Sequence, residues 1–147
     1  MTEYRKGAHT VYDIKYHFVW VTKYRYQVLQ GEIAVRVRDI IREVCLSHEI
    51  RIIKGHVGRD HVHLFVSAPP RLAVSKIMQY IKGKSSHRVQ QEYPSLRKRY
   101  WGRHIWARGY FCATAGSVTD KMIAAYIEQQ EPPPEDDFEV ADGGQLL

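Results

Sequence analysis

Two histidines in a short apolar run have the spacing best suited to metal chemistry. His61 and His63 alternate with Val62 and Leu64, which is typical of a β-strand. Side chains alternate between the two faces of a strand, so both imidazoles are predicted to project from one face. Two nitrogen ligands on a rigid element suit a divalent metal. A half-exposed structural strand also explains the pair taken alone, because two ligands do not complete a site.

Tyr126 and Gln130 form a second pair that could do chemistry. They are four residues apart in a helical pattern, so they are predicted to share one helical face. A tyrosine hydroxyl can act as a nucleophile in group transfer. Tyrosine on an apolar stripe is more often a core residue whose hydroxyl is satisfied at the edge, and Gln130 argues only mildly against that. Both interpretations stay open on these residues alone.

The elements that must hold these residues follow the order β-α-β-β-α-β-α. Strands are predicted over residues 11–22, 50–57, 61–68 and 104–114, and helices from Gly31 to about 47–49, over 72–91, and from Ser117. Short connections and right-handed crossovers leave few topologies. The simplest is an α+β fold: a ferredoxin-like split β-α-β antiparallel sheet with helices on one face and an added C-terminal helix that carries Tyr126.

Three residues near these elements have open roles. His56 is a possible neighbour of the histidine pair, with a structural or substrate-contacting role favoured over metal ligation. Gly109 is predicted to mark a bulge or a close approach of the backbone. Gly116 precedes the last helix, where it is either a hinge or an ordinary strand-ending glycine.

Composition indicates one small, basic domain. The chain has 147 residues, of which 44% are hydrophobic, enough for a single core. Six of its 16 acidic residues follow Gln130, where no Lys or Arg occurs, so residues 1–130 hold 22 basic against 10 acidic residues, a net charge of +12. We assign residues 1–130 to the domain and residues 131–147 to an acidic, proline-containing disordered tail.

No apolar run approaches the roughly 20 residues that span a bilayer, and the N-terminus lacks the apolar stretch of a signal peptide. We therefore expect a cytoplasmic protein with no membrane partner. Cys45 and Cys112 stand alone in apolar surroundings, so we expect core residues rather than a disulfide or a zinc site.

Three basic segments could contact nucleic acid. A basic domain that is also rich in Tyr and Trp suits a phosphate backbone with bases available for stacking, although a merely soluble basic protein has the same charge. The candidate DNA-binding residues are Lys23, Tyr24 and Arg25 after the first strand, Lys82, Lys84, Ser85 and Arg88 in the second helix, and Arg97 and Arg99 in the connection that follows. Solvated surface is the alternative for each segment.

The motifs together resemble a known family. The histidine pair within Asp60-His61-Val62-His63-Leu64 is followed some sixty residues later by Tyr126-Ile127-Glu128-Gln129-Gln130. Further matches are His17-Phe18-Val19-Trp20 with Lys23-Tyr24-Arg25, residues 81–86, and Trp106 with Gly109-Tyr110-Phe111. Over residues 11–130 the chain resembles the single-tyrosine HUH transposases of the smallest bacterial insertion sequences.

This resemblance implies a complete reaction. His61, His63 and Gln130 would bind Mg²⁺ or Mn²⁺, and Tyr126 would attack the scissile phosphate, leaving a 5′-phosphotyrosine and a free 3′-OH. A second 3′-OH then rejoins the strands without ATP, in agreement with the lack of a P-loop. The implied substrates are single-stranded DNA hairpins at the element ends and single-stranded target DNA. The protein would be associated with the nucleoid when it acts. The implied assembly is a homodimer whose subunits share active sites.

Three other functions compete with transposition. A domesticated HUH nickase acting on hairpins of repetitive elements would share every catalytic residue. A non-catalytic single-strand nucleic-acid-binding module on a ferredoxin-like sheet would have no use for His61, His63 and Tyr126 together. A phosphoesterase with two histidine motifs should show a second His-x-Thr or His-x-Ser, and the sequence has none.

Overall fold

A four-stranded antiparallel sheet forms the centre of the molecule. A computed structural model describes residues 4–114 and 120–130. The sheet order is β4-β5-β3-β6, built from β3 (Lys15–Val21), β4 (Arg51–Val57), β5 (His61–Ser67) and β6 (Phe111–Thr114). Each neighbouring pair runs antiparallel. This is the strand order of the predicted ferredoxin-like split β-α-β sheet.

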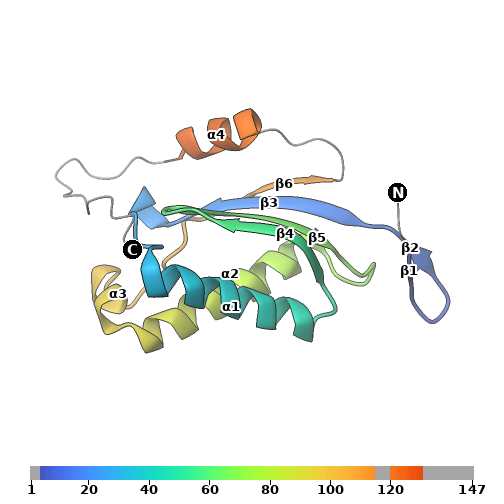
Figure 1. Ribbon diagram of the computed structural model, residues 1–147, viewed down its shortest axis with the longest axis horizontal. Coiled ribbons are helices and arrows are strands. Elements are labelled where there is room, and N and C mark those ends of the chain that lie inside the picture. Colours follow the sequence, from blue (N-terminus) through green and yellow to red (C-terminus); the bar gives the residue numbers. More distant parts are fainter. Residues whose placement is uncertain (1–3, 115–119, 131–147) are drawn as a thin grey trace.

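Two long helices cover one face of the sheet, and the C-terminal helix lies over the other (Figure 1). The covering pair is α1 (Gly31–Ser47) and α2 (Val74–Glu92), and the last helix is α4 (Asp120–Glu128). The apolar side chains of α1 and α2 recur at three- and four-residue spacing, which gives each helix one buried stripe. The predicted fold, including the added C-terminal helix, is therefore confirmed.

β3 is buried on both of its faces. Phe18 and Trp20 point into the core under α1 and α2, and both are fully buried. Val19 and Val21, on the opposite face, are 0% and 1% exposed. The period-two pattern of this strand predicts a single buried face; the second face is also covered because it lies toward α4, which contacts β3 (Figure 1).

Four boundaries differ from the predicted ones. The first predicted strand is split, because Val11–Tyr12 (β2) pairs with Arg5–Lys6 (β1) in a separate hairpin before β3 begins. The segment expected to be a plain connection holds a short helix, α3 (Pro94–Arg99), which begins at a proline. A 3-10 turn, η1 (Lys23–Arg25), follows β3. The fourth predicted strand was too long: only Phe111–Thr114 pairs with β3 along a ladder.

The backbone of residues 103–109 is held by side chains of α2 and by one antiparallel bridge, between Trp106 and Thr22 at the end of β3. Ser86 Oγ accepts a hydrogen bond from the amide of Ile105. Gln90 donates to the carbonyl of Arg103. Lys82 Nζ lies 2.9 Å from two further carbonyl oxygens of this segment, those of Ala107 and Gly109. Gly109 has φ +83°, a conformation that favours glycine, and it lies in the irregularity between the Trp106–Thr22 bridge and the Phe111–Val19 pair, where a bulge or a close approach of the backbone was predicted.

Three further expectations concern the C-terminal segments, the two cysteines and membrane-spanning helices. Gly116, Ser117 and the tail, residues 131–147, lie outside the described part of the chain. Cys45 is buried and Cys112 partly buried, and both are free thiols. Across residues 4–114 and 120–130, no helix has the length and apolar character to cross a membrane.

Replacing Ser85 by Ala should destabilise the fold. Ser85 is fully buried, and its hydroxyl accepts a hydrogen bond from Trp106 Nε1 at 2.9 Å. Without it the buried indole N–H loses its partner, so we expect the free energy of unfolding in urea to fall by about 1–3 kcal/mol. Ser75→Ala, on the exposed side of the same helix, is the control. Equal unfolding midpoints for the two variants would contradict this role.

Candidate active site

His61 and His63 project from one face of β5, as predicted. Both side chains are half-buried, while Val62 and Leu64 between and beside them are buried in the core. Two further histidines lie on the same face, because His56 on β4 pairs with His63, and His17 lies on β3 beyond Val19, the partner of His63. The strand register therefore gathers four imidazoles from three neighbouring strands.

His63 is in hydrogen-bond contact with His17. The distance from His17 Nδ1 to His63 Nε2 is 3.2 Å, so one of the two nitrogens must carry the proton. The His17 ring also stacks on Phe65, with centroids 4.1 Å apart and planes at 10°. His17 is 9% exposed. This packing fixes the His17 ring, which in turn restrains the orientation of His63.

His61 is oriented by the carboxylate that precedes it. His61 Nδ1 lies 3.0 Å from Asp60 Oδ1, and Asp60 Oδ2 lies 3.4 Å from Arg25 Nε. An ionised carboxylate only accepts, so Nδ1 carries the proton, and in the neutral ring Nε2 presents its lone pair. Gly58 leaves room for the ring, because a Cβ at that position would collide with it.

The Asp60 carboxylate is stabilised in its charged form. Burial alone would raise its pKa, but the hydrogen bond from His61 and the charges of His61 and Arg25 outweigh burial and lower the pKa below its usual value. Asp60 is therefore ionised at neutral pH. Through Arg25 it also joins the histidine strand to η1.

The histidine pair supplies part of a metal site. Within residues 4–114 and 120–130, no group of three or more His, Cys, Asp or Glu side chains is placed to hold a metal. Two imidazoles on one rigid strand fit a first-row divalent ion such as Mn²⁺ better than Mg²⁺, which prefers oxygen ligands. A complete site needs further ligands, and the predicted one, Gln130, has an amide oxygen.

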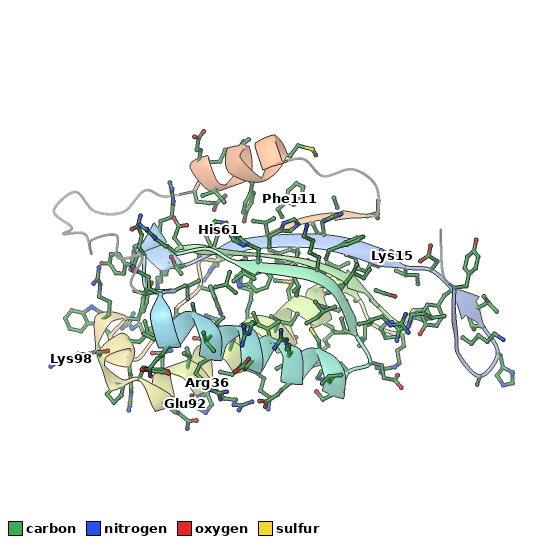
Figure 2. All side chains as sticks on the ribbon, in the orientation of Figure 1. Lys15, Arg36, His61, Glu92, Lys98 and Phe111 are labelled. Atoms are coloured by element: carbon green, nitrogen blue, oxygen red, sulfur yellow. The ribbon has the colours of Figure 1, made fainter. Side chains whose placement is uncertain are left out.

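Tyr126 and Gln130 lie on the same side of the sheet as the histidines but contact other groups. The Tyr126 ring packs on Phe111, with centroids 5.8 Å apart, and Phe111 projects from β6 toward α4 (Figure 2). Burial raises the pKa of the Tyr126 hydroxyl. Gln130 follows the end of α4, and its Nε2 donates to the carbonyl of Tyr126. Tyr126 has no hydrogen bond or ring contact with His61 among the described residues.

A basic cleft opens beside the end of β3. Its volume is about 780 Å³, and no Asp or Glu is found among the described residues that line it. It brings together four predicted DNA-binding residues, Lys23, Tyr24, Arg25 and Lys82, with Gln130. His104, Arg108 and Tyr110 also line it. The cleft begins at Val21, whose partner on β5 is His61.

The other predicted DNA-binding residues are dispersed. Ser85 is not exposed for DNA contact, because its buried hydroxyl accepts a hydrogen bond from Trp106 and donates one to the α2 backbone. Lys84 is exposed, and Arg88 forms an ion pair with Glu43 of α1. Arg97 and Arg99 are exposed on α3, where the Arg99 guanidinium lies 4.0 Å from the centroid of the Tyr26 ring.

The comparisons with known proteins span the residues of this site. Residues 10–130 match the family model described as "Transposase IS200 like". The chain belongs to the IS200-like transposase family. It is 38% identical over 128 residues to the ISDra2 transposase TnpA of Deinococcus radiodurans, covering 87% of this chain and 91% of the relative. It is also 38% identical over 130 residues to the transposase for insertion sequence element IS200 of Salmonella typhimurium, covering 88% and 85%.

The fold of this IS200-like transposase is similar to those of two solved transposase structures. A crystal structure from Deinococcus radiodurans, assigned as a transposase, superposes with a TM-score of 0.81 at 32% identity, covering 88% of this chain and 99% of that one. A REP-associated tyrosine transposase bound to a REP hairpin has the same fold, with a TM-score of 0.54 at 16% identity over 88% of this chain and 68% of that one. Transposases are DNA strand-transfer enzymes, so phosphodiester chemistry on DNA is the activity of this family.

Sequence reasoning did not assign roles to two residues of this site. His17 appeared only within the family motif His17-Phe18-Val19-Trp20, and Asp60 only within the histidine motif. The period-two alternation could have placed His17 on the histidine face, but only the register shows that it reaches His63.

Asp60→Ala should release the His61 ring. We expect the Nδ1-protonated tautomer of His61 to give way to a mixture, seen in the imidazole ¹⁵N shifts of the metal-free protein. Loss of a hydrogen-bonded buried charge should also lower the free energy of unfolding by about 1–3 kcal/mol. Asp13→Ala, which breaks only the surface pair with Lys15, is the matched control. Unchanged His61 shifts would contradict the orienting role.

Proposed function

We propose that this IS200-like transposase cuts and rejoins single-stranded DNA by transesterification, with Tyr126 as the nucleophile. One structural observation carries the proposal: β5 holds two imidazoles on one face, and Asp60 orients the ring of His61. Family membership supports strand transfer, and the basic cleft next to β3 supports a nucleic-acid substrate.

The Tyr126 hydroxyl forms a bond to phosphorus in the first step. Its oxygen attacks the scissile phosphate, the bond from phosphorus to the 3′-oxygen breaks, and the 3′-oxygen leaves as a hydroxyl once it has gained a proton. The strand is held as a 5′-phosphotyrosine. A 3′-OH from another DNA end reverses the step and releases Tyr126. One phosphodiester replaces another, so no nucleotide cofactor is consumed.

Tyr126 needs help to react at neutral pH. Burial raises its pKa above the usual value near 10, so the phenol stays protonated until its bond to phosphorus forms. Mg²⁺ or Mn²⁺ held by His61, His63 and the Gln130 amide oxygen would supply Lewis-acid stabilisation of the phosphate. The hydrogen bonds of His61 to Asp60 and of His63 to His17 would preorganise the two imidazoles.

We further propose that the Tyr126 helix serves the histidines of a second copy. In a single chain Tyr126 packs on Phe111 of its own sheet, and the Gln130 amide is bound to its own helix. A homodimer with exchanged α4 helices would bring each Tyr126 to the opposite histidine pair. In this proposal Gly116, which precedes α4 in the sequence, would act as the hinge for the exchange.

The proposed substrates are hairpins at insertion-sequence ends and single-stranded target DNA. Relatives encoded by insertion sequences are 38% identical to this chain, which supports a mobile element over a domesticated nickase. The REP-hairpin complex concerns a protein of the same fold, and hairpin recognition is proposed for this chain by extension.

Tyr126→Phe should abolish covalent attachment to DNA. Wild-type protein incubated with labelled single-stranded hairpin DNA and Mn²⁺ should form an adduct that survives denaturing electrophoresis. The variant lacks the attacking oxygen and should form none. Tyr80→Phe is the matched control, because Tyr80 stacks on His48 in the helix layer and should react like wild type. An adduct that survives Tyr126→Phe would exclude this nucleophile.

His63→Ala should separate cleavage from binding. We expect adduct formation to fall by at least about 100-fold, because an imidazole ligand is lost. Hairpin affinity should stay within about 3-fold, because cationic surfaces supply it. Gel-shift and adduct assays on the same DNA measure both, with exposed His9→Ala as the control. Equal losses of binding and cleavage, in a protein with an unchanged unfolding midpoint, would show that His63 acts in binding instead.

A further inference from the structure

Trp101 is the most exposed of the large apolar side chains among the described residues. It is 87% exposed, whereas Trp20 and Trp106 are 0% and 3% exposed. Trp101 is the second residue after α3, and it lies outside the histidine site and the cleft. Burial in the core of this chain therefore does not explain a tryptophan here.

The backbone holds Trp101 in a conformation that tryptophan disfavours. Its φ is +57°, and Gly102 after it has φ +73°. The Gly102 amide donates to the carbonyl of Arg97, and the Trp101 amide to that of Lys98, which is the helix-ending motif whose left-handed position is usually glycine. A bulky residue at this position is strained, and strain of this kind is often found at functional positions.

The surroundings of Trp101 are cationic. Residues 93–119 contain five Arg or Lys and no Asp or Glu. Arg97, Lys98, Arg99 and Arg103 flank Trp101 in the sequence and are exposed. Figure 2 shows Lys98 extending outward from the end of the helix layer. A second copy of this surface would bring like charges together, whereas a polyanion would neutralise them.

The Trp101 surface is joined to the cleft. The Tyr100 hydroxyl donates to the carbonyl of Lys23 at 3.1 Å, and the Tyr100 ring lies 5.5 Å from that of Tyr26. Lys23 lines the cleft. A DNA strand that enters the cleft can thus continue past η1 to the end of α3 and meet basic and aromatic side chains along this path.

We propose that Trp101 is a base-stacking residue for single-stranded DNA that extends from the cleft, with Arg97, Lys98 and Arg103 around its phosphates. Stacking on an aromatic face tolerates any base, so Trp101 contributes affinity without choosing the sequence. The inference depends on the proposed function only for the identity of the substrate, single-stranded DNA.

Two oligonucleotides test this assignment on the full-length chain: a blunt hairpin, and the same hairpin with a single-stranded flank. Trp101→Ala should weaken binding of the flanked hairpin by about 5- to 150-fold and leave the blunt hairpin unchanged. Trp101→Phe should keep most of the affinity. Leu46→Ala, which removes another exposed apolar side chain, is the control. The flanked DNA should quench wild-type tryptophan fluorescence, and this quenching should disappear in Trp101→Phe.

Trp101→Gly separates binding from folding. Glycine removes both the ring and the left-handed strain, so the thermal midpoint should rise by about 2–5 °C while flanked-hairpin affinity falls as in Trp101→Ala. Unchanged affinity in both variants would overturn the assignment. Quenching by anionic lipid vesicles but not by DNA, or concentration-dependent self-association that Trp101→Ala abolishes, would overturn it in favour of a membrane or a second copy.

The parallel adduct assay distinguishes the two proposals. If wild type forms the Tyr126 adduct while Trp101→Ala binds the flanked hairpin normally, only the stacking role fails. If Trp101 supports flank binding but no Tyr126-dependent adduct forms, the proposed nucleophile fails and the stacking role stands.

Discussion

The antiparallel pairing of β3 with β5 is the constraint on which the rest of the structure depends. Seven registered pairs, from Lys15 with Ser67 to Val21 with His61, join the two central strands. Side chains alternate along each strand, so this register fixes at once which residues enter the core and which face α4. A shift of one residue would turn His61 and His63 into the apolar layer under α1 and α2. The hydrophobic core and the histidine site thus share one determinant.

Polar residues have different roles on the two faces of the sheet: those on one face hold the backbone, and those on the other orient the histidines. On the helix side, α2 binds the backbone of residues 103–109 through Lys82, Ser86 and Gln90, and this segment forms one wall of the cleft. On the other side, His17 and Asp60 hold the two histidines of β5. Polar side chains thus hold the backbone in one layer and orient imidazoles in the other, according to the partners that each one meets.

Strained backbone is concentrated at one end of the sheet. Three of the four non-glycine residues with positive φ in the described chain are Tyr24, Arg25 and Trp101. η1 and the end of α3 meet there through the hydrogen bond from Tyr100 to Lys23. Hydrogen-bonded turns hold the backbone of these residues. For the proposed DNA contacts, a backbone held in advance would lower the entropy lost on binding and so offset the strain.

The sequence by itself determined the element order, the shared face of His61 and His63, and the family, because these follow from period-two and period-3.6 patterns and from motifs local in the chain. Only the tertiary structure decided that Ser85 is buried against Trp106, that residues 107–110 interrupt the pairing with β3, and that His17 meets His63. These facts depend on contacts between residues at least 21 positions apart, which local patterns do not encode. The charge of Lys82 is visible in the sequence, but only folding brings it to the cleft and to the carbonyls of Ala107 and Gly109.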